Sequence, residues 1–222
     1  MPAEADASLG NGIHWRLPEW FPSLNSTQLG LLKQYFQELI KFNKTINLVS
    51  SKTIPFADVI HFADCIEASK LIFEKYQPTE VWDFGSGNGF PGIVFAILQP
   101  NIRFVLLDSD VRKTEFLKTV VQNLGLKNVE VKAGSIENLK DGTVKFCVSR
   151  GLSVLSKAIL QARKVVPKGG IYCHLKSEEW GKEIADIPTQ LCSFWSPGLL
   201  GEYRLPIGEV KFSVVITERL SN

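Results

Sequence analysis

The sequence lacks the features that mark membrane and exported proteins. Its longest uninterrupted apolar run, Ile93 to Leu98, is far too short to cross a lipid bilayer. The first residues, MPAEADASLGNG, contain neither the basic start nor the apolar stretch of a signal peptide. We therefore expect a soluble cytoplasmic protein without a membrane partner.

Cysteine is scarce and widely spaced. The four cysteines, at positions 65, 147, 173 and 192, do not form the paired C-x-x-C spacing of zinc sites. Disulfide frameworks are typical of small secreted chains rather than of a chain of 222 residues. We expect reduced, mostly buried thiols and no metal ion.

A large excess of charge of one sign is also absent. Lys and Arg number 25 against 23 Asp and Glu, so overall charge implies no partner. Locally the balance differs, because the stretch from Gly142 to Ser177 contains no carboxylate and seven cations: Lys145, Arg150, Lys157, Arg163, Lys164, Lys168 and Lys176. On one shared face these side chains would bind phosphate groups of RNA; the alternative is an ordinary solvated helix face.

Two periodicities alternate through the second half of the chain. Short β-rich runs occur at Glu80–Phe84, Arg103–Asp108, Asn128–Lys132, Lys145–Ser149 and Gly170–Leu175, and helical patterns lie between them at Pro91–Leu98, Val111–Leu124, Ser135–Leu139 and Ser153–Val165. This order predicts an α/β fold with a mostly parallel sheet. Cys192–Trp195 and Val210–Thr217 flank a Pro/Gly loop with no room for a helix, so we expect a closing antiparallel hairpin and seven strands in total.

The first third of the chain is organised differently. Residues 1–25 are rich in Gly, Pro and small side chains, which predicts a loosely structured arm. Residues 26–76 predict a helical cap: one helix capped by Ser26 or Thr27, a loop over Asn43–Ser51, and a helix from Phe56 to Tyr76. Residues 77–222 form the α/β core, and the cap and core together make one domain over 26–222.

The most informative segment is VWDFGSGNGFPG, from Val81 to Gly92. A strand with Asp83 near its end turns through Gly85, Gly87 and Gly89, and glycines at such a turn let a ligand press against the main chain. Asp108 ends the next strand, where a carboxylate can accept both ribose hydroxyls of an adenosine-bearing cofactor.

Two cofactors fit this loop, and a turn that binds nothing is a third possibility. Gly87-x-Gly89-x-x-Gly92 matches the dinucleotide fingerprint of NAD-binding oxidoreductases. The alternative, which we favour, is S-adenosylmethionine: Asp83 suits its amino group, and Ile136 and Glu137 supply an apolar wall and an acceptor near the adenine. The closing hairpin is also typical of a Rossmann-like S-adenosylmethionine-dependent methyltransferase fold.

Several methyl acceptors can be compared. The Asn/Asp-Pro-Pro-aromatic loop that serves exocyclic amines is missing, because Val148-Ser149-Arg150-Gly151 occupies its place. Cys147 and Cys173 could be nucleophiles for carbon methylation, but both alternate within apolar strands and favour buried, inert thiols. Guanine N7 already carries a free lone pair, so alignment can serve where other acceptors need a general base.

Six ordered motifs carry a family resemblance: Asn43-Lys44-x-x-Asn47-Leu48, His61-x-x-Asp64, Asp83-x-Gly85-x-Gly87-x-Gly89-Phe90-Pro91-Gly92, Leu107-Asp108-Ser109-x-x-x-Lys113, Ser149-Arg150 and Leu175-Lys176. From about Leu29 onward the chain resembles the bacterial small-subunit rRNA guanine-N7 methyltransferases (RsmG, also called GidB). The resemblance implies methyl transfer from S-adenosylmethionine to N7 of one guanine in a loop of 16S rRNA. Cys65, Asn88 and Ser177 depart from the usual family residues.

The expected site follows from these motifs together. The expected cofactor residues are Asp83, Gly85, Gly87, Gly89, Phe90, Asp108, Ser109, Ile136, Glu137 and Arg150. The resemblance implies this role for Gly85, Phe90, Ile136, Glu137 and Arg150, and Arg150 is also expected to position the reactants. The expected RNA contacts are Asn43, Asn47, His61, Lys113, Lys164 and Lys176, although His61 and Asp64 could equally be structural. The partner is 16S rRNA or a small-subunit particle, and nothing calls for more than a monomer. A protein or small-molecule acceptor, and a catalytically silent RNA-binding module, stay open as alternatives.

Overall fold

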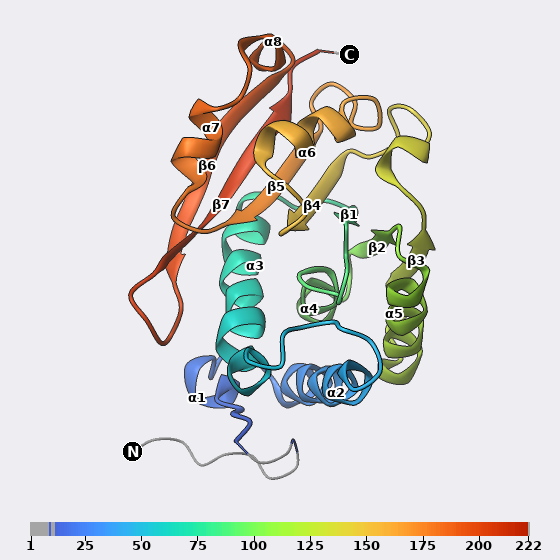
Figure 1. Cartoon of the computed structure of the whole chain (residues 1–222), viewed down its shortest axis with the longest axis vertical. Coiled ribbons are helices and arrows are strands. Elements are labelled where there is room, and N and C mark those ends of the chain that lie inside the picture. The colour runs from blue at the N-terminus through green and yellow to red at the C-terminus, as the bar shows by residue number, and fades with distance from the viewer. Residues whose placement is uncertain (1–8, 10–11, 222) are drawn as a thin grey trace.

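The sheet that organises the molecule has seven strands. The computed structural model describes residues 9 and 12–221. Across the sheet the strands follow the order β3-β2-β1-β4-β5-β7-β6 (Figure 1). Their bounds are β1 Glu80–Phe84, β2 Arg103–Asp108, β3 Val129–Ala133, β4 Phe146–Arg150, β5 Ile171–Lys176, β6 Trp195–Arg204 and β7 Lys211–Arg219.

Among the seven strands only β7, on the C-terminal side of the sheet, runs against the others. The first five strands are parallel, whereas β7 runs antiparallel to β5 and β6 antiparallel to β7. This confirms the predicted fold class, a mostly parallel seven-stranded sheet with a C-terminal antiparallel hairpin.

The first strand of the hairpin was placed wrongly by the sequence prediction. Cys192 ends helix α8 (Thr189–Cys192), and β6 extends from Trp195 to Arg204 through the segment expected to be a Pro/Gly loop. Pro197 is tolerated there because β6 is the edge strand, where a missing backbone N–H costs least.

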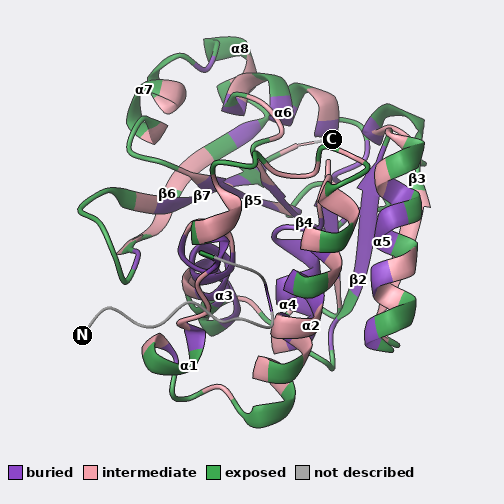
Figure 2. Ribbon diagram, turned by 60° about the horizontal axis from the view of Figure 1, so that its bottom comes forward, coloured by how far each residue is buried: buried purple, intermediate pink, exposed green. Residues whose placement is uncertain are grey.

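Helices cover both faces of the sheet. Helices α2 (Ser26–Asn43), α3 (Asp64–Lys75), α4 (Gly92–Leu98) and α5 (Val111–Leu124) pack on one face, and α6 (Leu155–Ala162) packs on the other. Successive strand residues serve opposite cores: Phe104 and Leu106 face the first, Val105 and Leu107 the second. Figure 2 shows the central strands coloured as buried. Within the described part of the chain no helix is long and apolar enough to span a bilayer.

The helical cap differs in detail from its prediction. Asn25, rather than Ser26 or Thr27, caps α2: its side chain accepts the Gln28 amide N–H at 2.9 Å and the Gln28 side chain accepts the Asn25 N–H at 3.1 Å. The expected helix from Phe56 to Tyr76 is broken into a 3-10 turn (Ile54–Phe56), a π-helix (Asp58–Ala63) and α3. π-helical turns are frequent at functional sites.

The described part of the segment expected to be a loose arm is packed against the cap. It contains helix α1 (Leu17–Trp20), and Leu17 and Phe21 are buried. The Arg16 guanidinium donates to both carboxylate oxygens of buried Asp58, at 2.9 and 2.8 Å. Residues 1–8 and 10–11 of this predicted arm lie outside the described residues.

Candidate functional site

Two adjoining cavities lie at the carboxyl ends of the parallel strands, the edge where open α/β sheets bind ligands. The first, here called the Arg150 cavity, measures about 470 Å³ and lies beside His61, Asp64, Phe90 and Arg150. The second, the Asp108 cavity, measures about 310 Å³ and is lined by Asp108, Ser109, Ile136 and Glu137, among others. Both cavities share Gly85, Gly87, Lys113 and Gly151 in their walls, so one elongated ligand can occupy parts of both.

The glycine loop separates the two cavities. Gly87 has φ +54°, a left-handed conformation that favours glycine. Its amide donates to Asp108 Oδ2 at 2.7 Å, which ties the loop to the end of β2. A Cβ on Gly87 would meet no protein atom nearer than 3.7 Å, so this face of the loop is free for a ligand.

The Asp108 cavity brings together the predicted adenosine-binding residues. The Asp108 carboxylate accepts one amide on each oxygen, from Gly87 and from Asp110 at 2.9 Å, which leaves lone pairs for further donors. Ile136 is an almost fully buried apolar wall, and the Glu137 carboxylate accepts a hydrogen bond from the Gln161 side chain at 3.1 Å.

Two of the predicted cofactor residues line neither cavity. The Asp83 carboxylate is buried and accepts the Gly92 amide N–H at 3.0 Å. Burial raises the pKa of Asp83 to about 7, against the opposing effect of that hydrogen bond. A Cβ on Gly89 would meet the Tyr35 hydroxyl at 2.7 Å, so Gly89 serves close packing of the cap. Asp83 and Gly89 therefore support the conformation of the glycine loop through internal contacts and do not line the cavities.

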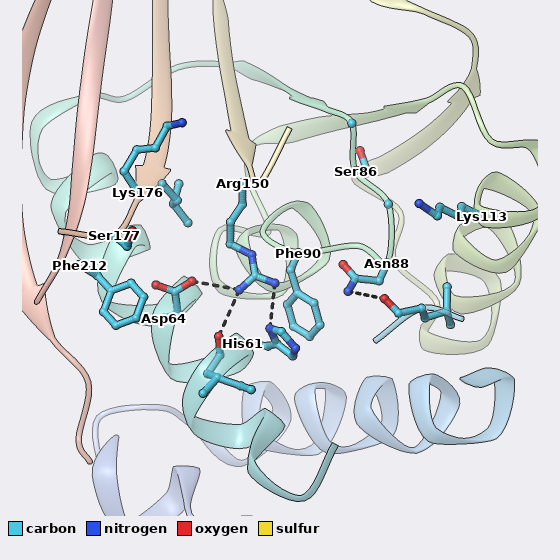
Figure 3. Close-up of a pocket in the computed structure, with 16 residues that line it drawn as sticks. His61, Asp64, Ser86, Asn88, Phe90, Lys113, Arg150, Lys176, Ser177 and Phe212 are labelled. Carbon is cyan, nitrogen blue, oxygen red and sulfur yellow. Dashed lines mark hydrogen bonds and ion pairs between the residues drawn. The ribbon is translucent and has the colours of Figure 1, made fainter. Parts of the chain in front are cut away.

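Arg150 connects the sheet to the helical cap. Its Nη1 donates to Asp64 Oδ2 at 3.0 Å and to the Ile60 carbonyl at 3.3 Å, and its Nη2 contacts His61 Nδ1 at 3.0 Å (Figure 3). All three partners come from the π-helix and the first residue of α3. The guanidinium also lies 5.0 Å from the centre of the Phe90 ring.

The protonation of His61 follows from this contact. A guanidinium only donates, so His61 Nδ1 accepts and the proton of the neutral ring lies on Nε2. Burial and the neighbouring Arg150 charge lower the pKa of His61 to about 3. His61 is therefore neutral near pH 7, and its Nε2–H has no hydrogen-bond partner among the described residues.

Of the predicted RNA contacts, His61, Lys113 and Lys176 line the Arg150 cavity, and Asn43, Asn47 and Lys113 line a neighbouring cavity of about 290 Å³. Asn43 holds the loop after α2, accepting the Leu48 and Val49 amides at 2.8 and 2.9 Å, whereas Asn47 is exposed. Lys113 lines both the Arg150 and the Asp108 cavity, and its side-chain ammonium has no hydrogen bond or ion pair to any described residue. Lys176 lines the Arg150 cavity, but its ammonium is tied to Glu183 Oε2 at 2.7 Å and to the Ser153 carbonyl at 2.8 Å.

Lys164 lies near the amino ends of the strands, away from the two cavities, so the cations of the basic stretch do not share one face. The Lys164 carbonyl accepts the Gly142 amide N–H just before β4 begins, whereas Arg150 ends β4. Lys145 and Lys168 likewise precede their strands, while Lys176 ends β5. The absence of carboxylates from a stretch of sequence does not show which way its side chains lie in the fold. Residues before a strand and residues after it lie at opposite ends of that strand, so cations close in sequence are separated here.

The thiols have the expected character. Cys65, Cys147 and Cys173 are free and buried, and Cys192 is free and exposed. Burial raises the pKa of the Cys147 thiol and of the Cys173 thiol, which keeps both protonated and poorly nucleophilic.

Four residues of the site were missed by sequence reasoning. The Asn88 side chain donates to the Leu48 carbonyl at 3.1 Å and joins the cap loop to the glycine loop. The Tyr203 hydroxyl donates to Asp64 Oδ1 at 2.7 Å, Phe212 lines the Arg150 cavity, and Glu183 pairs with Lys176. Only Asn88 stands within a recognised motif; the others depend on contacts between distant segments.

Fold and site together define a class of protein, the Rossmann-like methyltransferases. Solved structures share the fold: Bacillus subtilis YcgJ, 12% identical, covers 71% of this chain and 100% of its own with a TM-score of 0.54. A mutant of MtNAS, 13% identical, covers 86% of this chain and 72% of its own with a TM-score of 0.56.

Sequence comparison identifies the family within this class. Residues 28–194 match the family model for rRNA small subunit methyltransferase G, GidB. Ribosomal RNA small subunit methyltransferase G 3 of Bdellovibrio bacteriovorus is 53% identical over 94% of this chain and 95% of its own. Ribosomal RNA small subunit methyltransferase G of Syntrophomonas wolfei is 35% identical over 72% and 76%. The chain therefore belongs to the RsmG/GidB family.

Proposed function

We propose that this protein transfers a methyl group from S-adenosylmethionine to N7 of a specific guanine in a loop of 16S rRNA. Family membership supports the class of reaction and substrate, and the likeness to methyltransferase relatives favours this donor over NAD. The donor and the acceptor atom are proposals about this chain.

The two cavities fit the proposed donor. The face of Gly87 that a Cβ would fill is open, and the Asp108 carboxylate has lone pairs left to accept ribose hydroxyls. Asp108, Ser109, Ile136 and Glu137 would hold the adenosine half, and the backbone of Gly85 and Gly87 would lie along the methionine half. When bound, S-adenosylmethionine supplies an electrophilic methyl group on a sulfonium centre.

One observation carries the choice of acceptor atom: the Arg150 cavity offers no free general base among the described residues. The Asp64 carboxylate is 3% exposed, is ion-paired with Arg150 and accepts the Tyr203 hydroxyl, so little of it can reach a ligand. His61 uses its only acceptor nitrogen on Arg150, and its low pKa keeps the ring from taking up a proton near pH 7. An acceptor that must lose a proton would find no partner there, whereas guanine N7 needs only alignment with the methyl group.

The test is to map the modified nucleotide. Naked 16S rRNA and partly assembled small-subunit particles from cells lacking this gene are incubated with the protein and methyl-labelled S-adenosylmethionine. We expect label in 16S rRNA and, after borohydride reduction and aniline cleavage, a break at one guanine. Label on another atom of the RNA would refute the N7 assignment, and label only in proteins or small molecules would refute the rRNA substrate.

A further inference from the structure

The Arg150 cavity has two distinguishable ends. One end is the wall that it shares with the Asp108 cavity, formed by the glycine loop. The other end is formed by residues that the Asp108 cavity lacks, from the carboxyl end of β5 and the start of β7: Leu175, Lys176, Ser177 and Phe212. Figure 3 shows Phe212 and Lys113 on opposite sides of Arg150. A donor that lies along the glycine loop leaves the β5–β7 end for the acceptor.

A purine acceptor needs a flat apolar surface, and one aromatic ring of the cavity is already covered. Phe90 is 2% exposed; His61 stacks on it at 5.1 Å with an angle of 26°, and Tyr35 and Phe62 pack against it within about 5 Å. The Arg150 guanidinium lies over the same ring. Phe90 therefore supports neighbouring side chains and has no face left for a base.

Phe212 is placed differently. It is partly exposed and lines the β5–β7 end of the cavity. Behind it lies Tyr203, its partner across the β6–β7 ladder, with ring centres 6.1 Å apart and planes only 20° from parallel. Tyr203 is in turn fixed by its hydrogen bond to Asp64.

The same hydrogen bonds connect this ring to the centre of the site. Asp64 accepts from Tyr203 on one oxygen and from Arg150 on the other. The orientation of the hairpin ring and that of the guanidinium are thus set by one buried carboxylate, which is 3% exposed. A base resting on Phe212 is held at a defined place relative to Arg150.

We propose that Phe212 is the platform on which the acceptor guanine stacks, with Tyr203 as a positioning residue behind it. The inference rests on the proposed function and names the part of the site that receives the base. Aromatic side chains commonly bind unpaired RNA bases by stacking, with the base edges free. N7 lies on such an edge.

The experiment compares side chains of similar size with and without an aromatic face. Phe212→Leu removes the face, Phe212→Tyr restores it, and Phe194→Leu removes an exposed ring just before β6, at the far end of the hairpin. Steady-state KM for the 16S substrate, affinity for S-adenosylmethionine by calorimetry, and thermal stability are measured for each. Loss of one stacked base corresponds to an increase in KM of about 5- to 150-fold for Phe212→Leu.

We expect Phe212→Tyr to return KM to within about threefold of the parent protein, Phe194→Leu to match the parent, and donor affinity to stay the same. An unchanged KM in Phe212→Leu, an equal loss in Phe212→Tyr, or a parallel loss of donor affinity would overturn the platform. If Phe212→Leu does not fold, Phe212→Trp decides: retained KM supports stacking and a loss like that of truncation refutes it. If the parent protein itself methylates no rRNA guanine, both proposals fail; if it does and Phe212→Leu behaves like it, only the platform fails.

Discussion

Arg150 and Lys176 end neighbouring strands, and each is the second residue of a two-residue family motif, yet their surroundings differ. Arg150 is bound by a carboxylate, a carbonyl and an imidazole of the helical cap. Lys176 is bound by Glu183 of helix α7 (Trp180–Ala185) and by the Ser153 carbonyl before α6. The planar fork of Arg150 joins three groups at fixed directions, whereas the Lys176 ammonium pairs as a point charge.

This difference separates two uses of a cation at the same edge of a sheet. Arg150 orders the residues around the proposed acceptor end, and its partner Asp64 extends the network to the hairpin. Lys176 fastens α7 to the sheet and takes part in no contact with His61, Asp64 or Phe90 among the described residues. The expected consequences of disturbing each network therefore differ in size.

The largest expected effect is that of Arg150→Lys. The variant keeps the positive charge but cannot serve Asp64, His61 and Ile60 together, and misplacement of about 1 Å can reduce turnover about 100-fold. Single-turnover methylation of 16S rRNA measures the loss. The matched control is Arg163→Lys, an exposed cation of the same segment. Turnover within a few-fold of the parent would show that charge alone suffices and that the comparison with Lys176 is wrong.

The second largest expected effect is that of acid, which should lower the free energy of unfolding by protonating His61. The folded pKa of His61, about 3, lies below the ordinary value of 6.5, so the unfolded chain binds the proton more readily. The stabilisation is complete above pH 6.5 and is lost as pH falls toward 3, by about 3 kcal/mol between 6.5 and about 4.

Urea unfolding of the parent protein and of His61→Gln over this pH range measures the contribution of His61. Burial also lowers the pKa of His174, so a second acid-sensitive group is present in both proteins. The difference between the two slopes belongs to His61, and parallel slopes would contradict its neutral, buried state.

Removal of the Tyr203 hydroxyl should have a smaller effect. Tyr203→Phe keeps the ring behind Phe212 but leaves Asp64 Oδ1 without its donor in a buried place, at a cost of about 1–3 kcal/mol. We expect kcat to fall severalfold with donor affinity retained, since Arg150 loses part of its support. Tyr76→Phe, a tyrosine at the other edge of the sheet, is the control. Equal melting temperatures and equal kcat for the two variants would remove Tyr203 from the network.

The smallest effect is expected for Lys176→Met. Glu183 keeps its hydrogen bond from the Leu155 amide and is partly hydrated, so the loss in stability is about 1 kcal/mol and KM for RNA changes about threefold at most. Lys113→Met removes a cation that no described residue engages, and we expect a larger rise in KM and a shallower salt dependence. KM for RNA is measured for both variants at several salt concentrations. A larger rise in KM for Lys176→Met than for Lys113→Met would contradict the prediction.

Much of the fold follows from local patterns. The predicted bounds of β1, β2 and α5 match the structure because short, mostly apolar β-rich runs and a 3.6-residue stripe are strong signals in these segments. The π-helix from Asp58 to Ala63 and the course of β6 through Pro197 carry no comparable signal. Both depend on what packs beside them.

The site divides in the same way. Asp108, Ile136 and Glu137 were predictable because residues that follow parallel strands meet at one edge of the sheet. The inward turn of Asp83 toward Gly92, and the meeting of Tyr203 with Asp64, depend on side-chain direction and hairpin register, which spacing along the chain does not determine. For the same reason the sequence left open whether the cations of the basic stretch around Lys164 share one face, and the structure divides them between the two ends of their strands.

The hydrogen bond between Asp64 and Tyr203 also bears on how the molecule folds. It joins residues 139 positions apart, and contacts of such long sequence separation form only after a large entropic cost of ordering the chain between them. The β6–β7 hairpin must first pair onto β5 for Tyr203 to reach its partner. Partly folded forms with an intact glycine loop but an unpaired hairpin therefore lack the Tyr203 support of Asp64 and hold Arg150 less firmly.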